Sequence, residues 1–236
     1  MEKTGHHIRL ESFFNITSRE VESRIGYTVD ADISPRIASL IDEYIRQART
    51  LIEPSYSYNI LRIQDVDGHV VQIDGPLLLE SQVISKVLNR CTQVAAFGVT
   101  IGSHLETRAD ELGDKGLILE AFILDTIGSC VTEKAVDFVQ GIIGEMAHLQ
   151  NLAISRRFSP GYCDWPLTEQ KKLFRLFESN DLHVNLTDSC LMQPRKSISG
   201  LFGVKPLQAH ASAAAFNPCS DCGRKDCSMR RTPDPV

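Results

Sequence analysis

The sequence lacks a hydrophobic run long enough to cross a membrane. A membrane-spanning helix needs about 18 consecutive apolar residues, and the nearest approach, residues 116–130, is interrupted by Glu120 and Asp125. The first residues, MEKTGHHIRLESFF, also lack the apolar segment of a signal peptide and include Glu2 and Glu11. We therefore expect a soluble, cytoplasmic protein with no membrane partner.

The sequence also lacks an excess of positive charge. Its 25 Lys and Arg residues are outnumbered by 30 Asp and Glu residues, which gives a net charge of -5. Nucleic-acid-binding domains carry basic patches, so we expect no nucleic-acid partner. Hydrophobic residues make up 42% of the 236 residues, which is ordinary for a globular protein and sufficient for one large core.

Cysteines number seven, which excludes a framework in which every cysteine is paired within the chain. In a reducing cytoplasm such cysteines are thiols or metal ligands and not disulfides.

Hydrophobic periodicity predicts helices and short strands in alternation. Ser34 and Pro35 form an N-cap and first-turn pair that opens the first strongly periodic helix, and Pro54 ends it. Asp67-Gly68 is a hairpin signal between two expected strands. Further helices are expected over 81–89, 103–112, 115–148 and 169–178, and strands over 58–64, 69–73, 93–100, 184–187 and 197–202. Gly128, Gly141 and Gly144 in the longest helix mark either close packing or a break.

These elements lack the regular strand–helix–strand rhythm of a parallel sheet. We therefore expect an α+β domain over residues 1–204, with a mainly antiparallel sheet flanked by helices. Residues 205–236 are rich in Ala, Ser, Cys, Arg and Pro and are predicted to form a Cys-containing C-terminal appendage.

Two segments concentrate polar side chains on irregular backbone. The first is RRFSPGYCDWP, residues 156–166, in which prolines and a glycine exclude a regular helix. It is interpreted either as a binding loop or as a structural loop whose aromatic residues fill a core. The second is LTDSCLMQPRKSISG, residues 186–200, where Ser197 and Ser199 share one face of a strand because side chains alternate.

A third polar feature is a column on the most apolar helix. Asp125, Ser129 and Glu133 are spaced four residues apart and so lie on one helical face. Buried carboxylates require partners; Arg157 and the positive end of a ligand are the candidates. The alternative is that this face is exposed to solvent.

The order RFSPGYCDWP, a helix and then LTDSCLMQPRKSISG resembles the activation domain of vitamin B12-dependent methionine synthase, and in particular its free-standing relatives. The resemblance covers roughly residues 55–204. It implies an activation-domain-like fold and a groove that holds S-adenosylmethionine beside the corrin of a partner. It also implies support for the reductive methylation of cobalamin.

The resemblance further assigns the site residues. Arg157 matches the family's R-x-x-x-G-Y arginine, whose guanidinium suits a carboxylate. Ser129 stands where the family has a glutamate that contacts S-adenosylmethionine. The predicted cofactor-binding residues are Arg157, Ser159, Gly161, Tyr162, Asp188, Ser189, Ser197, Ser199 and Glu133. No catalytic residue is assigned, because the chemistry resides in the partner's cobalt.

The C-terminal segment adds a possible metal site. Cys219, Cys222 and Cys227 have the spacing C-x2-C-x4-C, which suits zinc or an iron–sulfur cluster if Cys163, Cys190, His210 or an external group completes the set. The alternative is a group of reduced surface thiols.

The leading functional hypothesis is an accessory or reactivation protein for a corrinoid methyltransferase. Its partners would be a corrinoid protein such as methionine synthase and a flavodoxin- or ferredoxin-type electron donor. Two alternatives remain: a non-catalytic module that binds the corrinoid protein, and a metal or electron-transfer protein acting through Cys219, Cys222 and Cys227.

Overall fold

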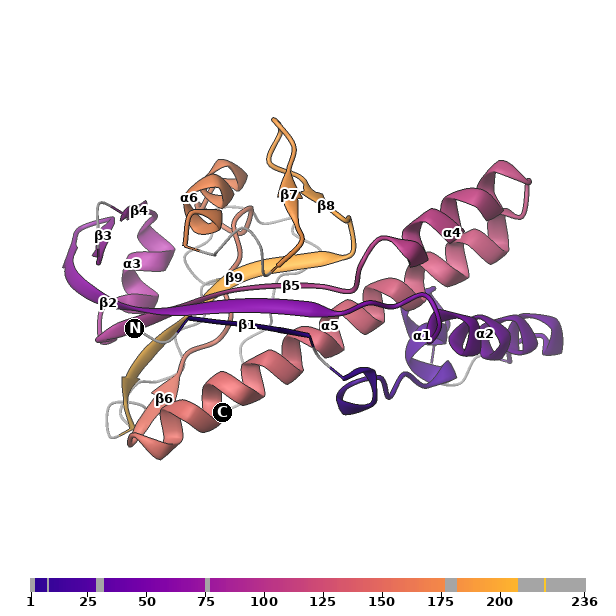
Figure 1. Ribbon diagram of the computed structural model, residues 1–236, viewed down its shortest axis with the longest axis horizontal. Coiled ribbons are helices and arrows are strands. Elements are labelled where there is room, and N and C mark those ends of the chain that lie inside the picture. The colour runs from indigo at the N-terminus through magenta and orange to yellow at the C-terminus, as the bar shows by residue number, and fades with distance from the viewer. Residues whose placement is uncertain are drawn as a thin grey trace.

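The computed structural model describes residues 3–7, 9–28, 32–74, 77–176, 182–207 and 219. Their centre is an antiparallel sheet in the order β4-β3-β2-β5-β9-β6, with β1 also paired to β2 (Figure 1). The strands are β1 (Lys3–His7), β2 (Ser55–Asp67), β3 (Val70–Ile73), β4 (Leu77–Glu80), β5 (Gln93–Thr100), β6 (Leu152–Ile154) and β9 (Ser197–Pro206). A small separate hairpin joins β7 (Asn185–Leu186) to β8 (Met192–Gln193). The predicted α+β fold with an antiparallel sheet is confirmed.

Helices cover the sheet and extend beyond one end of it. Figure 1 shows α5 running along one side of the central strands, with α6 and the β7–β8 hairpin on the other side. The helical elements are η1 (Leu10–Ser12), α1 (Ser18–Arg24), α2 (Pro35–Ala48), α3 (Gln82–Leu88), α4 (His104–Asp114), α5 (Ile118–Leu149), η2 (Leu167–Glu169) and α6 (Gln170–Phe174). The expected helix over 169–178 is therefore shorter on its described part, and residues 177 and 178 lie outside the described residues.

Strand β5 divides two cores because its side chains alternate between the two faces of the sheet. Ala95, Phe97 and Val99 pack into the main core, which α5 dominates. Phe97 stacks on Phe202 of β9 with ring centroids 4.8 Å apart. The opposite face contributes Val94 to a second core formed with α3 and with the loop that follows β6. This loop contains the first predicted polar segment, so the second core fixes its position.

Helix α5 continues without a break through its three glycines. Gly128 faces α4 and the residue before β9: a Cβ atom there would lie 2.6 Å from Leu105 Cδ2 and 3.2 Å from Lys196 Cε. Gly128 thus marks close packing, one of the two alternatives left open by the sequence. Gly141 has no neighbour within 4 Å of such a Cβ atom.

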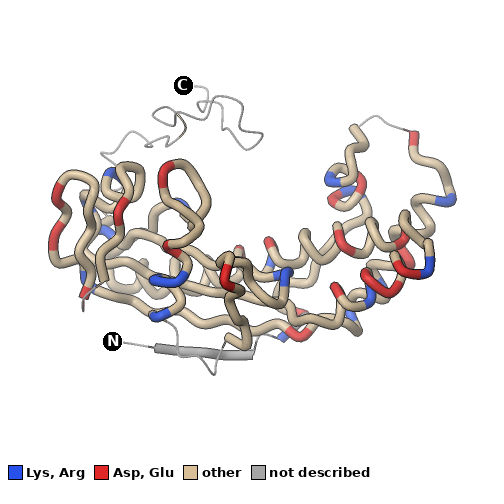
Figure 2. Tube along the Cα trace, turned by 90° about the horizontal axis from the view of Figure 1, so that it is seen from above, with Lys and Arg blue, Asp and Glu red and all other residues tan. Residues whose placement is uncertain are grey.

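Strand β9 runs to Pro206, and nearly all of the predicted appendage lies outside the described residues. The boundary at residues 204 and 205 stays a prediction. Within the described part of the chain, no helix is both long enough and apolar enough to span a membrane. Figure 2 shows acidic and basic residues interspersed along the trace.

Candidate functional site

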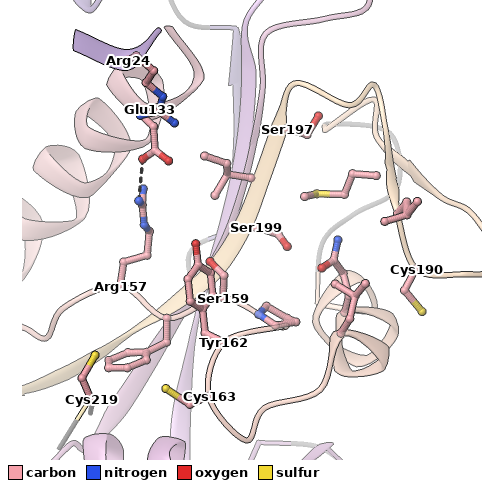
Figure 3. A pocket seen from close by; sticks show the side chains of 17 residues that line it. Arg24, Glu133, Arg157, Ser159, Tyr162, Cys163, Cys190, Ser197, Ser199 and Cys219 are labelled. Atoms are coloured by element: carbon pink, nitrogen blue, oxygen red, sulfur yellow. Dashed lines mark hydrogen bonds and ion pairs between the residues drawn. The ribbon is translucent and has the colours of Figure 1, made fainter. Parts of the chain in front are cut away.

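The two predicted polar segments meet at one groove with a volume of about 610 Å³ (Figure 3). The loop after β6 forms one wall and β8 with the start of β9 forms the other, while α1 and α5 close one end. The lining residues are Arg24, Glu133, Arg157, Phe158, Ser159, Pro160, Tyr162, Cys163, Leu167, Gln170, Cys190, Leu191, Met192, Ser197, Ile198, Ser199 and Cys219. The volume lies in the range of ligand pockets.

The loop reaches this position because it pairs with β9. Phe158 N–H donates to Leu201 O at 3.0 Å, and Leu201 N–H donates to Phe158 O at 2.8 Å. The approach is so close that a Cβ atom at Gly200 would overlap Phe158 O. The glycine of the second segment thus allows the first segment to lie beside it, which brings Ser159 and Ser199 to the same groove.

The far part of the loop is structural. Trp165 is 1% exposed and fills the second core. Gly161, with a φ of 96°, donates its N–H to Trp165 O at 2.8 Å and closes the turn. Asp164 accepts hydrogen bonds from Ser81 Oγ at 2.7 Å and from the N–H of Gln82 at 2.6 Å, at the start of α3. The structural interpretation therefore holds for Trp165 and Asp164. Arg157, Ser159 and Tyr162 of the same segment line the groove, and binding of a ligand there stays a prediction.

Arg157 joins the loop to α5. Its Nη2 lies 2.7 Å from Glu133 Oε2, so the predicted pairing of Arg157 with the polar column is confirmed for Glu133 (Figure 3). The other terminal nitrogen, Nη1, is buried and has no hydrogen-bond partner among the described residues. A buried donor without a partner costs about 1–3 kcal/mol, so this atom is suited to bind a ligand acceptor.

The rest of the polar column has a different partner. Lys196 Nζ lies 2.8 Å from Asp125 Oδ1 and 2.9 Å from Ser129 Oγ. Ser129 also donates to Asp125 O at 3.2 Å. Asp125 and Ser129 therefore have partners within the chain, and the Asp125 side chain is still 47% exposed. The column is thus partly buried and partly open to solvent.

The two predicted serines of β9 differ in whether their hydroxyl groups already have hydrogen-bond partners. Ser197 Oγ lies 2.8 Å from Thr100 Oγ1 and 2.7 Å from Pro194 O, which makes it part of the sheet's own hydrogen bonding. Ser199 is 2% exposed, and its Oγ has no partner among the described residues. Ser199 thus offers the groove a second buried polar atom.

Three of the predicted binding residues do not line the groove: Gly161, Asp188 and Ser189. The turn between β7 and β8 explains the latter two. Thr187 N–H donates to Leu191 O at 2.9 Å, Leu191 N–H donates to Thr187 Oγ1 at 3.0 Å, and Cys190 has a φ of 64°. This tight turn brings Cys190 and Leu191 to the groove and leaves Asp188 and Ser189 out of its lining.

Several lining residues were not predicted, notably Arg24, Gln170, Leu191 and Met192. Leu191 and Met192 belong to a quoted motif, and their apolar character was the available signal. Arg24 lies on α1, far from either motif in sequence, and no local signal identifies it.

The predicted metal site is only partly described. Cys219 lines the groove near the loop that carries Cys163 (Figure 3), whereas Cys222, Cys227 and His210 lie outside the described residues. Among the residues that the structure does describe, no group of three His, Cys, Asp or Glu side chains is arranged to hold a metal ion. The zinc or iron–sulfur site stays a prediction.

Comparisons with known proteins concern the family and the fold of the chain. The family model described as vitamin B12-dependent methionine synthase, activation domain, matches residues 61–217, which is more than half of the chain. A solved structure described as the MetH reactivation domain bound to AdoHcy superposes with a TM-score of 0.66 at 14% identity. The match covers 87% of this chain and 79% of that one, and at this identity it establishes the fold. No curated protein matches the chain.

Proposed function

The chain belongs to the family of activation domains of vitamin B12-dependent methionine synthase, and we propose that it acts as an accessory reactivation protein for a corrinoid methyltransferase. In this proposal its groove binds S-adenosylmethionine and presents it to the cobalamin of a partner protein. The partner's cobalamin supplies the methyl-transfer chemistry, with an electron from a flavodoxin- or ferredoxin-type donor. This chain binds and orients the methyl donor.

The observation that carries the proposal is a pair of buried polar atoms without partners. Arg157 Nη1 and Ser199 Oγ belong to residues on opposite walls of the groove, and neither has a hydrogen-bond partner among the described residues. A guanidinium binds a carboxylate through parallel hydrogen bonds, and a hydroxyl both donates and accepts. The amino-acid end and the ribose of S-adenosylmethionine offer these complementary groups.

The remaining walls suit the rest of such a ligand. Phe158, Leu167 and Met192 provide apolar surface for an adenine ring. Tyr162 and Leu191 also line the groove and are 52% and 58% exposed. Exposed aromatic and apolar side chains at a groove are typical of contact surfaces, and we assign these two to the contact with the partner's corrin.

Calorimetric titration of S-adenosylmethionine into the full chain tests the binding step. Arg157→Ala should weaken affinity by about 10- to 150-fold, the equivalent of about 1.5–3 kcal/mol for a hydrogen bond to a charged group. Arg195→Ala is the matched control: it lies in the second motif, but its guanidinium binds Asp110 at 2.7 Å and 2.9 Å away from the groove. Equal affinities for the two variants would contradict the assignment of Arg157.

The reactivation step needs a second measurement. Oxidised cobalamin on a corrinoid protein, supplied with S-adenosylmethionine and a reductant, should regain its methylcobalamin absorption spectrum faster when this chain is added. Loss of that acceleration in Arg157→Ala, with retention in Arg195→Ala, is the expected result. An unchanged rate on addition of the wild-type chain would reject the accessory role.

One observation favours the alternative of a binding module without S-adenosylmethionine. The carboxylate of Asp125 is suited to bind the positive charge of a ligand. The ammonium group of Lys196 already lies against this carboxylate and against Ser129. Glu133 is the remaining acid in the described lining, and it already pairs with Arg157. If no S-adenosyl ligand binds while the corrinoid protein does, this alternative replaces the leading proposal.

A further inference from the structure

Helix α1 is held firmly against α5. Thr17 and Glu20 form a capping box at its start, and Val21 is fully buried in the main core. Glu20 Oε1 lies 2.6 Å from Lys134 Nζ of α5. Arg24 follows Glu20 by four residues, so it lies on the same face of α1 one turn later, and its side chain lines the groove.

The position of Arg24 relative to α5 is supported by a second feature. Burial raises the pKa of the Cys130 thiol, and the charges of Arg24 and Glu133 also act on it. Both charged groups therefore lie near Cys130 of α5. Figure 3 shows Arg24 and Arg157 on opposite sides of Glu133 at one end of the groove.

This end of the groove carries an excess of positive charge. Two guanidinium groups and one carboxylate make up the charged residues in the described lining. Glu133 accepts from Arg157 Nη2 at 2.7 Å, which neutralises one of the two cations. Arg157 Nη1 is left buried and without a partner among the described residues. One positive charge and one donor therefore remain available for an anion.

We propose that Arg24 and Arg157 together form an anion site for the α-carboxylate of the S-adenosyl ligand, and that Arg24 makes the groove selective for ligands that carry this carboxylate. The inference rests on the proposed function and extends it to a residue outside the family match, which begins at residue 61. Guanidinium groups suit this task because their planar donors match the geometry of a carboxylate.

Two ligands isolate the contribution of the carboxylate. S-adenosylhomocysteine carries the amino-acid group, whereas 5′-methylthioadenosine keeps the adenosine and the sulfur but lacks that group. Calorimetry on the full chain should give tighter binding of S-adenosylhomocysteine. In Arg24→Ala its affinity should fall about tenfold, the scale of a charge-assisted hydrogen bond, while the affinity for 5′-methylthioadenosine stays the same.

Arg19→Ala is the matched control. Arg19 is an exposed arginine of the same helix that does not line the groove, so it should leave both affinities unchanged. Arg24→Gln, which keeps a polar, unbranched side chain but removes its charge, should reproduce the Arg24→Ala result. Raising the ionic strength should shrink the difference between wild type and Arg24→Ala, because Arg24 is exposed and its charge is screened.

Three outcomes would overturn the inference in different ways. Equal effects of the Arg24 and Arg19 variants, with Arg157→Ala still weakening the ligand, reject the role of Arg24 and leave the proposed function intact. Parallel losses for both ligands in the Arg24 variants indicate a structural role and also reject it. Failure of the wild-type chain to bind any of these nucleosides rejects the proposed function and this inference together.

Discussion

The ammonium nitrogen of Lys196 lies 2.8 Å from the carboxylate of Asp125, and this pair ties the residue before β9 to the N-terminal half of α5. Ser129 adds a hydrogen bond at 2.9 Å from the next turn of the helix. The methylene groups of Lys196 pass over Gly128, which has no side chain to obstruct them. These contacts with α5 therefore fix the position of the groove wall that β9 forms.

Lys196→Met should destabilise the fold by about 1 kcal/mol. Methionine keeps the packing of the aliphatic stem but removes the charge, and the hydrogen bonds that are lost involve charged groups. The cost stays moderate because the Asp125 side chain is 47% exposed and water can replace the ammonium group. Urea denaturation measures the change. Lys115→Met, at an exposed lysine, should change stability by less than about 0.5 kcal/mol, and equal costs would refute the pairing.

Gly128→Ala should destabilise the protein by about 1–3 kcal/mol, because the new methyl group would overlap Leu105 and displace Lys196. Gly141→Ala in the same helix meets no atom within 4 Å. It should stabilise the protein by about 0.5–1 kcal/mol through the higher helix propensity of alanine. Thermal unfolding of both variants gives the comparison, and changes of the same sign would disprove the packing role of Gly128.

Asp164 should contribute a pH-dependent part of the stability. Partial burial raises its pKa, but hydrogen bonds from Ser81 and from the N–H groups of Gln82 and Val83 outweigh this effect and hold the pKa below 3.8. Because the pKa is lower in the folded chain, the ionised carboxylate stabilises the fold above pH 3.8. This contribution is lost as the pH falls through the folded value.

Asp164→Asn should therefore cost about 1 kcal/mol at pH 7, the scale of a helix N-cap, and the cost should shrink as the pH is lowered through the folded pKa of Asp164. Urea denaturation at a series of pH values measures it. Asp137→Asn, on an exposed position of α5, should show no such convergence. A difference that persists at low pH would mean that the shape of the side chain matters and its charge does not.

Helices and strands with a clear local pattern of residues were predictable from the sequence. Strands that form only because a neighbouring strand pairs with them were not. β5 was expected over 93–100 and is found there, because a continuous apolar run is favourable only between two cores. β6 and β8 have three and two residues, too few for any periodicity, and exist because a neighbouring strand supplies their hydrogen bonds. α5 continues through Gly141 because packing against neighbouring elements outweighs glycine's low propensity.

The order of the two motifs in the sequence predicted one shared groove. The prediction succeeded for those motif residues that lie close together in space. Ser159 and Ser199 meet because their motifs pair through Phe158 and Leu201. Asp188 and Ser189 share the second motif, but a turn with a positive φ at Cys190 keeps them out of the lining. Arg24 comes from a helix whose position is set by tertiary packing, which no local pattern encodes.

An ion pair between Arg157 and Glu133 lies at one end of the groove. Arg157 and Glu133 are 27% and 38% exposed and lie 2.7 Å apart. A double-mutant cycle with Arg157→Met and Glu133→Gln should give a coupling energy near 1 kcal/mol, the upper end for pairs that water still reaches. Urea denaturation without ligand measures the four proteins.

The pair between Arg195 and Asp110 provides the control for this cycle. Its contacts of 2.7 Å and 2.9 Å are equally short, but its side chains are 56% and 61% exposed, so its coupling should fall below about 0.5 kcal/mol. A coupling above about 3 kcal/mol for Arg157 and Glu133 would mean that the fold depends on the pair, as for buried ion pairs. A coupling near 1 kcal/mol means that the fold does not depend on the pair, so the loss of ligand affinity expected for the Arg157 variants can be measured on a folded protein.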